Sequence, residues 1–312
     1  MTVFASRKER LCFHILDGGI SDESFGELEK LLLQLRSDFK IVRYRLSGCA
    51  QRDFQDAYGK RMAYKRLLLP DLLKDLDFVL YCDVDFMWLG DVAELWKQRD
   101  ENVLLKATHD LAPETISREQ RWFSVHGIPF DNERYFCSGL LLMNLKLFRT
   151  GDVAAKVYAF LDKHPDVNLA DQSALNAVLS EQVGFLPQKW QVFSRDVTSH
   201  QIATGDVAVH YAGEVPWRRR SKIDMLTDTV LVWHRFNAKL RGISLWRSLR
   251  LYFGAYEIFG RRLMFRFAVS PLTKKIFRIA LRLTSRKDYE QRFGMWWRSL
   301  DPRNPVICTP PA

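Results

Sequence analysis

Hydrophobic and polar positions alternate in blocks along the first 217 residues. Short apolar runs, which predict strands, occupy residues 11–16, 41–46, 78–82, 103–105, 135–145 and 207–213. Between the first two runs, apolar side chains recur at helical spacing, from Phe25 through Leu28 to Leu35. Strands that alternate with helices predict an α/β fold built on a largely parallel, Rossmann-like sheet.

Helical patterns also follow the later strands, with one exception. We expect helices after Ser21, over residues 64–76 with an interruption at Pro70, from Asp91, over 153–161 and from residue 170. Residues 111–134 are polar, contain two prolines and lack a sustained period. That segment predicts a long loop, and such loops commonly serve as lids or binding loops.

The composition is that of a globular protein whose charge is divided unevenly. Residues 1–217 hold 26 basic and 31 acidic side chains, whereas residues 218–312 hold 21 and 6. This division predicts a catalytic domain over 1–217 and a basic, aromatic, mainly helical region over 218–312. The five cysteines lack C-x-x-C spacing, which argues against a structural zinc site or a disulfide scaffold and favours a reducing cytoplasm. No apolar run reaches about 18 residues, and no secretory signal is expected.

Two carboxylates directly follow the most apolar strand. The run 78–82 predicts a strand buried on both faces of a parallel sheet, and Asp83 and Asp85 come immediately after it. Ligands of open α/β sheets bind beyond the carboxyl ends of strands, where two carboxylates suit a divalent cation and phosphate. The alternative interpretation is a strand end with solvated acids.

Other polar motifs accompany this pair in a fixed order. Taken singly, His210 at a strand end predicts a structural histidine, and Asp171-Gln172 at a helix start predicts a cap. The ordered set comprises Tyr64-x-Arg66, Leu80-Tyr81-x-Asp83-x-Asp85, Phe136-x-Ser138-Gly139, Asn144-Leu145, Asp171-Gln172-x-x-x-Asn176 and His210-Tyr211-x-Gly213-x-x-Pro216-Trp217. Over residues 5–217 this set resembles family 8 glycosyltransferases, retaining enzymes that include bacterial lipopolysaccharide galactosyl- and glucosyltransferases.

The resemblance implies a GT-A fold and a metal-assisted transfer of a hexose, galactose or glucose, from a UDP-sugar to lipopolysaccharide or another glycan. It implies Asp83, Asp85 and His210 as ligands of Mn²⁺, with Mg²⁺ as the alternative. Asp171 and Gln172 match the pair beneath the anomeric carbon. We favour front-side attack, in which a UDP phosphate oxygen accepts the proton of the acceptor hydroxyl. The substrate-binding positions that the resemblance implies are Arg66, Val84, Asp110, Ser138, Gly139, Gly213 and Trp217.

Three departures from the family pattern support alternative functions. The chain starts just before the family's second strand, so we expect the first strand and its Asp-rich loop to be missing. Cys137 stands where the family has Asn, and Val215 where it has Lys; Arg218 or Arg219 could reach the diphosphate instead. These departures favour a degenerate member that acts as a binding or scaffolding protein. A metal-dependent nucleotidyltransferase is a third possibility, but it leaves the His210-Tyr211-x-Gly213 motif unexplained.

The basic region predicts a membrane contact. Lys274, Arg278, Arg282 and Arg286 recur every four residues and would line one face of a helix. An amphipathic helix of this kind lies in a membrane interface and attracts anionic lipid, which predicts a peripheral protein at the cytoplasmic face of the inner membrane. The alternatives are a helix packed on the catalytic domain and, ranked last, a groove for nucleic acid.

Overall fold

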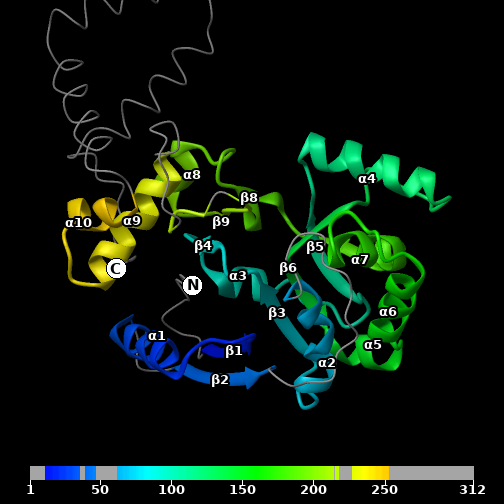
Figure 1. Ribbon diagram of the computed structural model, residues 1–312, viewed down its shortest axis with the longest axis horizontal. Helices are drawn as coiled ribbons and strands as arrows, with labels where there is room; N and C mark the ends of the chain where they lie inside the picture. The colour runs from blue at the N-terminus through cyan, green and yellow to red at the C-terminus, as the bar shows by residue number, and fades with distance from the viewer. Residues whose placement is uncertain (1–10, 36–38, 47–61, 214, 218–226, 253–312) are drawn as a thin grey trace, which may run out of the picture. The chain divides into compact units, whose positions relative to one another are not determined.

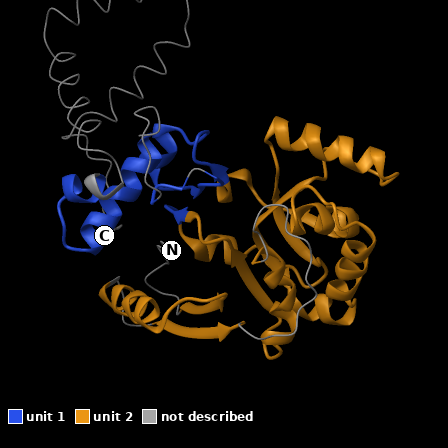
Figure 2. Cartoon of the chain, in the orientation of Figure 1, with its two compact units in different colours: residues 1–2, 87–90, 192–312 blue, residues 3–86, 91–191 orange. Residues whose placement is uncertain are grey.

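The computed structural model describes residues 11–35, 39–46, 62–213, 215–217 and 227–252 (Figure 1). The chain divides into two compact units, coloured in Figure 2. Unit 2 comprises residues 3–86 and 91–191, and unit 1 comprises residues 1–2, 87–90 and 192–312. The functional boundary expected at residue 217 stays a prediction.

A four-stranded sheet forms the centre of unit 2. Its order is β3 (Phe78–Cys82), β6 (Phe136–Asn144), β5 (Leu105–His109) and β7 (Val183–Phe185). The central strand β6 is buried at every position and runs antiparallel to both neighbours, whereas β5 and β7 are parallel. The α/β class is confirmed, with a mixed sheet.

The expected placement of β3 is wrong. We expected a strand buried on both faces of a parallel sheet, but β3 pairs antiparallel with β6, and all five of its residues are partly exposed. Within the described residues β3 ends the strand order of this sheet. An apolar run reports burial of side chains on average, but it carries no information on the direction of the neighbouring strand.

A second, two-stranded sheet in unit 2 follows the sequence pattern closely. Strands β1 (Leu11–Asp17) and β2 (Phe39–Arg45) are parallel, and α1 (Asp22–Leu35) connects them. The hydroxyl of Ser21 accepts a hydrogen bond from the backbone N–H of Ser24 at 3.1 Å. Asp22 and Glu23 occupy the first turn, where the helix dipole favours acids. The expected strand–helix–strand segment is confirmed.

The remaining helices of unit 2 surround the four-stranded sheet (Figure 1). The segment from Ala63 is a 3₁₀ helix, η1 (Ala63–Leu68), continued by α2 (Leu69–Leu72), with Pro70 in the first turn of α2. The core between sheet and helices contains fully buried Leu105, Phe136 and Val157. The other helices are α3 (Val92–Trp96), α4 (Pro113–Val125), α5 (Leu145–Thr150), α6 (Val153–Lys163), α7 (Asp171–Leu179), η2 (Ser180–Gln182) and η3 (Gln188–Trp190).

Helix α4 corrects the loop expected over residues 111–134. It begins at Pro113, a residue suited to the first turn because its fixed φ is helical and it lacks an N–H group. Glu119, Trp122 and Phe123 are buried and share one face at spacings of three and four residues. The pattern was missed because one of these three buried positions is a carboxylate.

Within the described residues, unit 1 contains a three-stranded sheet and three helices. The sheet order is β4 (Phe86–Trp88), β9 (Ala208–His210) and β8 (Val192–Phe193), and α8 (Ser199–Thr204) lies between β8 and β9 in the chain. Met87, Val209 and Val232 are buried together in its core. Helices α9 (Asp228–Leu240) and α10 (Leu245–Tyr252) pack against each other.

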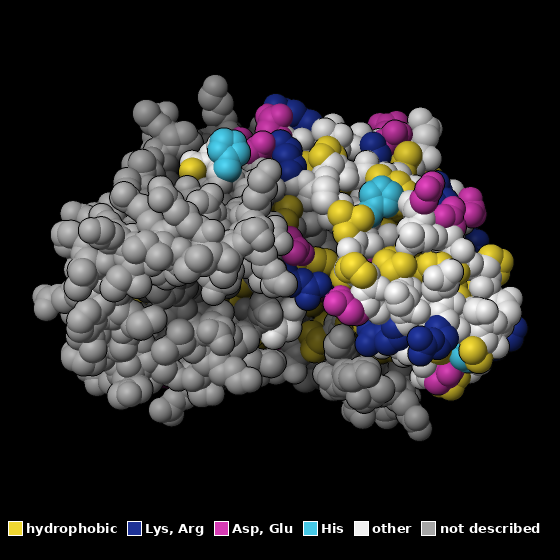
Figure 3. Space-filling view, turned by 90° about the horizontal axis from the view of Figure 1, so that it is seen from above, with side chains coloured by type: hydrophobic (Ala, Val, Ile, Leu, Met, Phe, Trp, Pro, Cys, Tyr) yellow, Lys and Arg dark blue, Asp and Glu magenta, His cyan; other side chains and the backbone are white. Residues whose placement is uncertain are grey.

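The sequence led to two expectations about membranes, and the described residues bear on the first of them, the absence of a spanning helix. In the part of the chain that the structure describes, no helix has both the length and the apolar character needed to cross a membrane. The basic helix expected over residues 274–286 lies outside the described residues, as do Arg218 and Arg219. On the face shown in Figure 3, basic and acidic side chains are interspersed among the coloured residues.

Candidate functional site

The two aspartates of the Asp-x-Asp motif follow β3 directly. The backbone N–H of Asp83 donates to the carbonyl of Gly139 at 2.8 Å, which extends the pairing of β3 with β6 by one step. Val84, between the aspartates, is 83% exposed. An apolar side chain so open to solvent, directly between two carboxylates, is available for contact with a ligand.

Arg66 connects Asp83 to Asp171 inside unit 2. Its guanidinium is buried, with Nη2 3.0 Å from Oδ1 of Asp83 and Nε 3.0 Å from Oδ2 of Asp171. Nη1 donates to the carbonyl of Ser138, and the group lies 4.3 Å from the ring centre of Tyr81. Burial raises the free energy of a lone charge by several kcal/mol, so this arginine and the two carboxylates stabilise one another. The position next to the motif is as expected, but Arg66 is engaged by internal partners.

The ionisation of Asp171 reflects the same surroundings. Burial raises its pKa from 3.8 to about 6, the positive charge of Arg66 opposes that rise, and the negative charge of Asp83 adds to it. The side chain is 3% exposed. Asp171 is therefore a desolvated carboxylate whose charge is opposed by that of Arg66.

Gln172 is held at both ends of its side-chain amide. Its Nε2 donates to Oδ2 of Asp110 at 2.8 Å, and its Oε1 accepts from the backbone N–H of Ser138 at 3.0 Å. The other oxygen of Asp110 accepts from the N–H of Ala112 at 3.0 Å. Asp110, Ser138, Asp171 and Gln172 are all at least nine-tenths buried. The structure therefore brings these four residues and Asp83, all expected site residues of unit 2, together around Arg66 and the backbone of β6.

Cys137 and Asn176 show how the β6 segment is supported. Asn176 accepts from the backbone N–H of Phe136 and donates to its carbonyl, both at 2.8 Å. Cys137 is 4% exposed, and burial raises the pKa of its thiol, which keeps the thiol protonated. A buried neutral thiol is a weak hydrogen-bond partner, so it cannot replace the asparagine amide that the resemblance implied.

The expected site residues of unit 1 lie at the end of β9 and just beyond it. His210 is 6% exposed, and its ring stacks on Phe193 with 5.5 Å between ring centres. Gly213 has φ of 76°, a conformation that other residues rarely adopt. Trp217 packs on Tyr211 and Trp233, and Val215 is buried.

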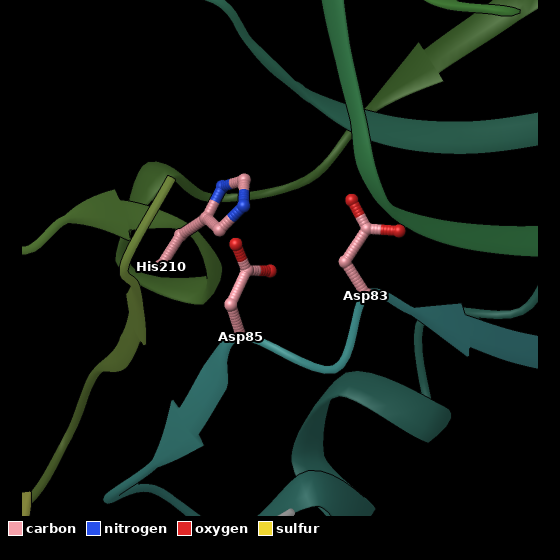
Figure 4. Close-up of side chains that lie close together, drawn as sticks. All are labelled: Asp83, Asp85 and His210. Carbon is pink, nitrogen blue, oxygen red and sulfur yellow. The ribbon is translucent and has the colours of Figure 1, made fainter. Parts of the chain in front are cut away.

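Strand pairing explains why the side chain of His210 lies close to those of Asp83 and Asp85. Asp85 is followed at once by β4, and β4 pairs with β9, the strand that ends at His210. Figure 4 shows the three side chains; one ligand atom of each lies within 4.8 Å of the others. Two carboxylates and an imidazole form a donor set that accepts Mn²⁺. Among the described residues, no other group of three acids, histidines or cysteines meets this criterion.

Three polar side chains of the same region were given no role in the sequence analysis. Tyr81 donates its hydroxyl hydrogen to Oδ1 of Asp83 at 2.6 Å. Glu119 and Tyr135 form a buried hydrogen bond of 2.9 Å near Gln172. Tyr81 lies within a recognised motif, but Glu119 lies in the segment interpreted as a loop, and no spacing rule identified it.

Comparison with known proteins agrees with the motif order. The family model of Glycosyl transferase family 8 matches residues 2–221. General stress protein A of Bacillus subtilis is 24% identical over 228 residues, which cover 67% of this chain and 77% of that protein. The lipopolysaccharide glucosyltransferase WaaO of Escherichia coli is 26% identical over 67% of this chain and 64% of its own length.

Solved structures show the same fold. The galactosyltransferase LgtC, solved in complex with donor and acceptor sugar analogs, superposes with a TM-score of 0.56 at 22% identity, over 76% of this chain and 87% of LgtC. A bifunctional glycosyltransferase, WbbM, gives a TM-score of 0.55 at 19% identity, over 69% of this chain and 42% of WbbM. At these identities the likeness is evidence for the fold alone, and it confirms the expected GT-A architecture.

Proposed function

Because the chain belongs to glycosyl transferase family 8, we propose that it is a retaining hexosyltransferase that moves galactose or glucose from a UDP-sugar to lipopolysaccharide or another glycan. The observation that carries this proposal is the buried group of Asp110, Asp171 and Gln172 around Arg66 and β6. Polar side chains are costly to bury, so a concentration of them at strand ends and a helix start indicates a functional site.

A divalent cation fits the residues that follow β3 and end β9. Asp83, Asp85 and His210 would hold it, and we propose Mn²⁺, with Mg²⁺ as the alternative, because an imidazole is present in the set. When bound, such a cation would offset the negative charge of the departing UDP. Val84, exposed between the aspartates, would contact the nucleotide. Gly139, Gly213 and Trp217 complete the proposed donor-binding positions.

The partners of Asp171 and Gln172 favour front-side attack over a covalent intermediate. Oε1 of Gln172 already accepts a hydrogen bond from Ser138, and Asp171 is paired with Arg66. In the proposed step the acceptor oxygen bonds to the anomeric carbon while the bond from that carbon to the UDP phosphate breaks. The acceptor proton passes to the departing phosphate oxygen. While the bond to the phosphate breaks, Asp171 and Gln172 would stabilise the positive charge that develops on the sugar.

The test is turnover of UDP-galactose and UDP-glucose with Mn²⁺, with lactose and extracted lipopolysaccharide as acceptors. We expect UDP release, and a product whose new linkage is α when analysed by NMR. Asp85→Asn should lower the rate by at least about 100-fold, since one carboxylate ligand is lost, while Asp75→Asn, at an exposed position, should not. A β-linked product would contradict retention, and UDP binding without turnover would favour the scaffolding alternative, which the buried Cys137 supports.

We also propose that the protein is peripheral at the cytoplasmic face of the inner membrane. The support is the excess of 21 basic over 6 acidic residues in 218–312. Flotation with vesicles containing phosphatidylglycerol at low salt, lost at high salt, is the expected result. Absence of flotation at low salt would contradict it.

A further inference from the structure

Glu119 is a fully buried acid that the proposed reaction does not use. It lies on α4 and is 0% exposed. Its Oε2 accepts hydrogen bonds from the hydroxyl of Tyr135 at 2.9 Å and from that of Ser173 at 2.6 Å. Its Oε1 has no hydrogen-bond partner among the described residues. A carboxyl group buried with half of its acceptors unused lowers stability, so a role beyond packing is the better explanation.

One of the two hydrogen bonds leads to Gln172. Burial, together with the nearby charge of Glu119, raises the pKa of Tyr135 well above its usual value, so the hydroxyl keeps its proton. That proton is donated to Glu119, which leaves the lone pairs of the hydroxyl toward Nε2 of Gln172, 3.5 Å away. Nε2 also donates to Asp110. Glu119 thus fixes the direction of the hydroxyl, and the hydroxyl presents only an acceptor to the amide.

The other hydrogen bond leads to the start of α7. Ser173 Oγ accepts from the backbone N–H of Leu169 at 2.9 Å while it donates to Glu119. The turn in between contains Ala170 at φ 53°, a conformation disfavoured for any residue with a Cβ, and it is closed by a hydrogen bond of 3.0 Å from Gln172 N to Leu169 O. The carboxyl therefore supports the backbone of Gln172 as well as its side chain.

We infer that Glu119 is a positioning residue that helps to hold the amide of Gln172 in its orientation, with Oε1 toward the N–H of Ser138 and Nε2 toward Asp110. Its contribution is to keep the Tyr135 hydroxyl as a second acceptor for Nε2. If the amide were rotated by 180°, its NH₂ group would face the Ser138 N–H and its oxygen would face the Asp110 carboxyl. The consequence for catalysis rests on the proposed function, because it assumes that Gln172 faces the donor sugar. The orientation itself is independent of that assumption.

The test compares Glu119→Gln with Glu114→Gln, an exposed glutamate on the same helix. A glutamine at 119 can both donate and accept, so it no longer fixes the hydroxyl direction, at nearly unchanged volume. For UDP-hexose turnover we expect kcat to fall roughly 10-fold to 100-fold, with KM for the UDP-sugar changed less than about twofold. Tyr135→Phe should give the same split. Glu114→Gln should change neither constant.

A second readout separates this inference from the proposed function. In ¹⁵N NMR of the full chain, the two Nε2 protons of Gln172, assigned with Gln172→Glu, should exchange slowly with solvent. In Glu119→Gln and in Tyr135→Phe they should exchange at least about tenfold faster. If the unmodified protein shows no turnover while the two variants show the faster amide exchange, the proposed function fails and the positioning role stands. Tyr135→Phe retains the hydrogen bond between Glu119 and Ser173, so it serves as the test variant if Glu119→Gln does not fold. Unchanged exchange of the Gln172 amide protons in Tyr135→Phe would overturn the inference.

Discussion

The two units bury polar side chains in different ways. In unit 2, Arg66 is paired with Asp83 and Asp171, so that charges from three separate segments meet, and it also donates to the backbone carbonyl of Ser138. In unit 1, Ser248 Oγ lies 2.9 Å from Nδ1 of His234 and accepts a hydrogen bond from Asn237, also at 2.9 Å. These hydrogen bonds join α9 to α10.

The difference indicates which cluster serves chemistry and which serves packing. Two helices can be joined by neutral hydrogen bonds, which lose little free energy on burial once their partners are satisfied. Burying an arginine and two carboxylates costs much more, and apolar residues would stabilise such a position at least as well. A charged cluster is therefore expected where a reaction needs fixed charges, and unit 2 has it next to Gln172.

The largest effect is expected from removing the cation at the centre of the unit 2 cluster. Arg66→Met leaves Asp171 buried without its ion-pair partner, which should lower the free energy of unfolding by about 3–5 kcal/mol and abolish turnover. Urea denaturation followed by circular dichroism measures the first effect.

The matched control removes both charges. In Arg66→Met/Asp171→Asn the buried carboxylate is gone, and only Asp83, whose side chain is 32% exposed, is left without this cation. The double variant should therefore be more stable than Arg66→Met alone by about 1–3 kcal/mol. If the double variant were as unstable as the sum of the two single variants, the ion pair would not be the reason for the loss.

A smaller effect concerns the pH dependence of unit 1. Burial lowers the pKa of His234 from 6.5 to about 4, so the neutral ring is favoured in the folded protein. Stability from this group is complete above pH 6.5 and is lost as the pH falls from 6.5 toward 4, by about 3 kcal/mol at most. Denaturation of the full chain at several pH values, compared with His234→Gln, should show that the variant lacks this contribution.

In unit 2, the contribution of Asp171 to stability should depend on pH with the opposite sign. The pKa of Asp171 is raised to about 6, so the folded protein binds this proton more tightly than the unfolded chain does. Between about pH 4 and 6, this group therefore makes the fold less stable as the pH rises. Asp171→Asn should remove that trend; a variant that retained it would assign the trend to another carboxyl.

The smallest effect concerns the strained turn before α7. Ala170 adopts φ 53° and ψ −123°, a region that glycine occupies readily. Ala170→Gly should relieve about 1–3 kcal/mol of strain and lose about 0.5–1 kcal/mol through greater freedom of the unfolded chain, for a net gain of about 1 kcal/mol. Thermal unfolding measures this change in stability, and a melting temperature lower than that of the unmodified protein would contradict the prediction.

Sequence patterns predicted elements better than they predicted pairing. The apolar runs at β1, β3 and β6 and the cap before α1 were identified because side-chain burial and capping depend on neighbouring residues in the chain. The direction of β3 was not predicted, because it is set by a strand distant in the sequence. Helix α4 was not predicted, because one of its buried positions is a carboxylate. The family motif placed Asp171 and Gln172 together, but it could not reveal Glu119.

The most direct test of the donor site is calorimetric titration of UDP into the full chain. With Mn²⁺ present, we expect binding that is lost without the metal and weakened at least about 100-fold in Asp85→Asn, with Asp75→Asn unaffected. That result would support the Asp-x-Asp segment as the place where metal and nucleotide meet. UDP binding of equal strength with or without Mn²⁺, or in Asp85→Asn, would contradict the account.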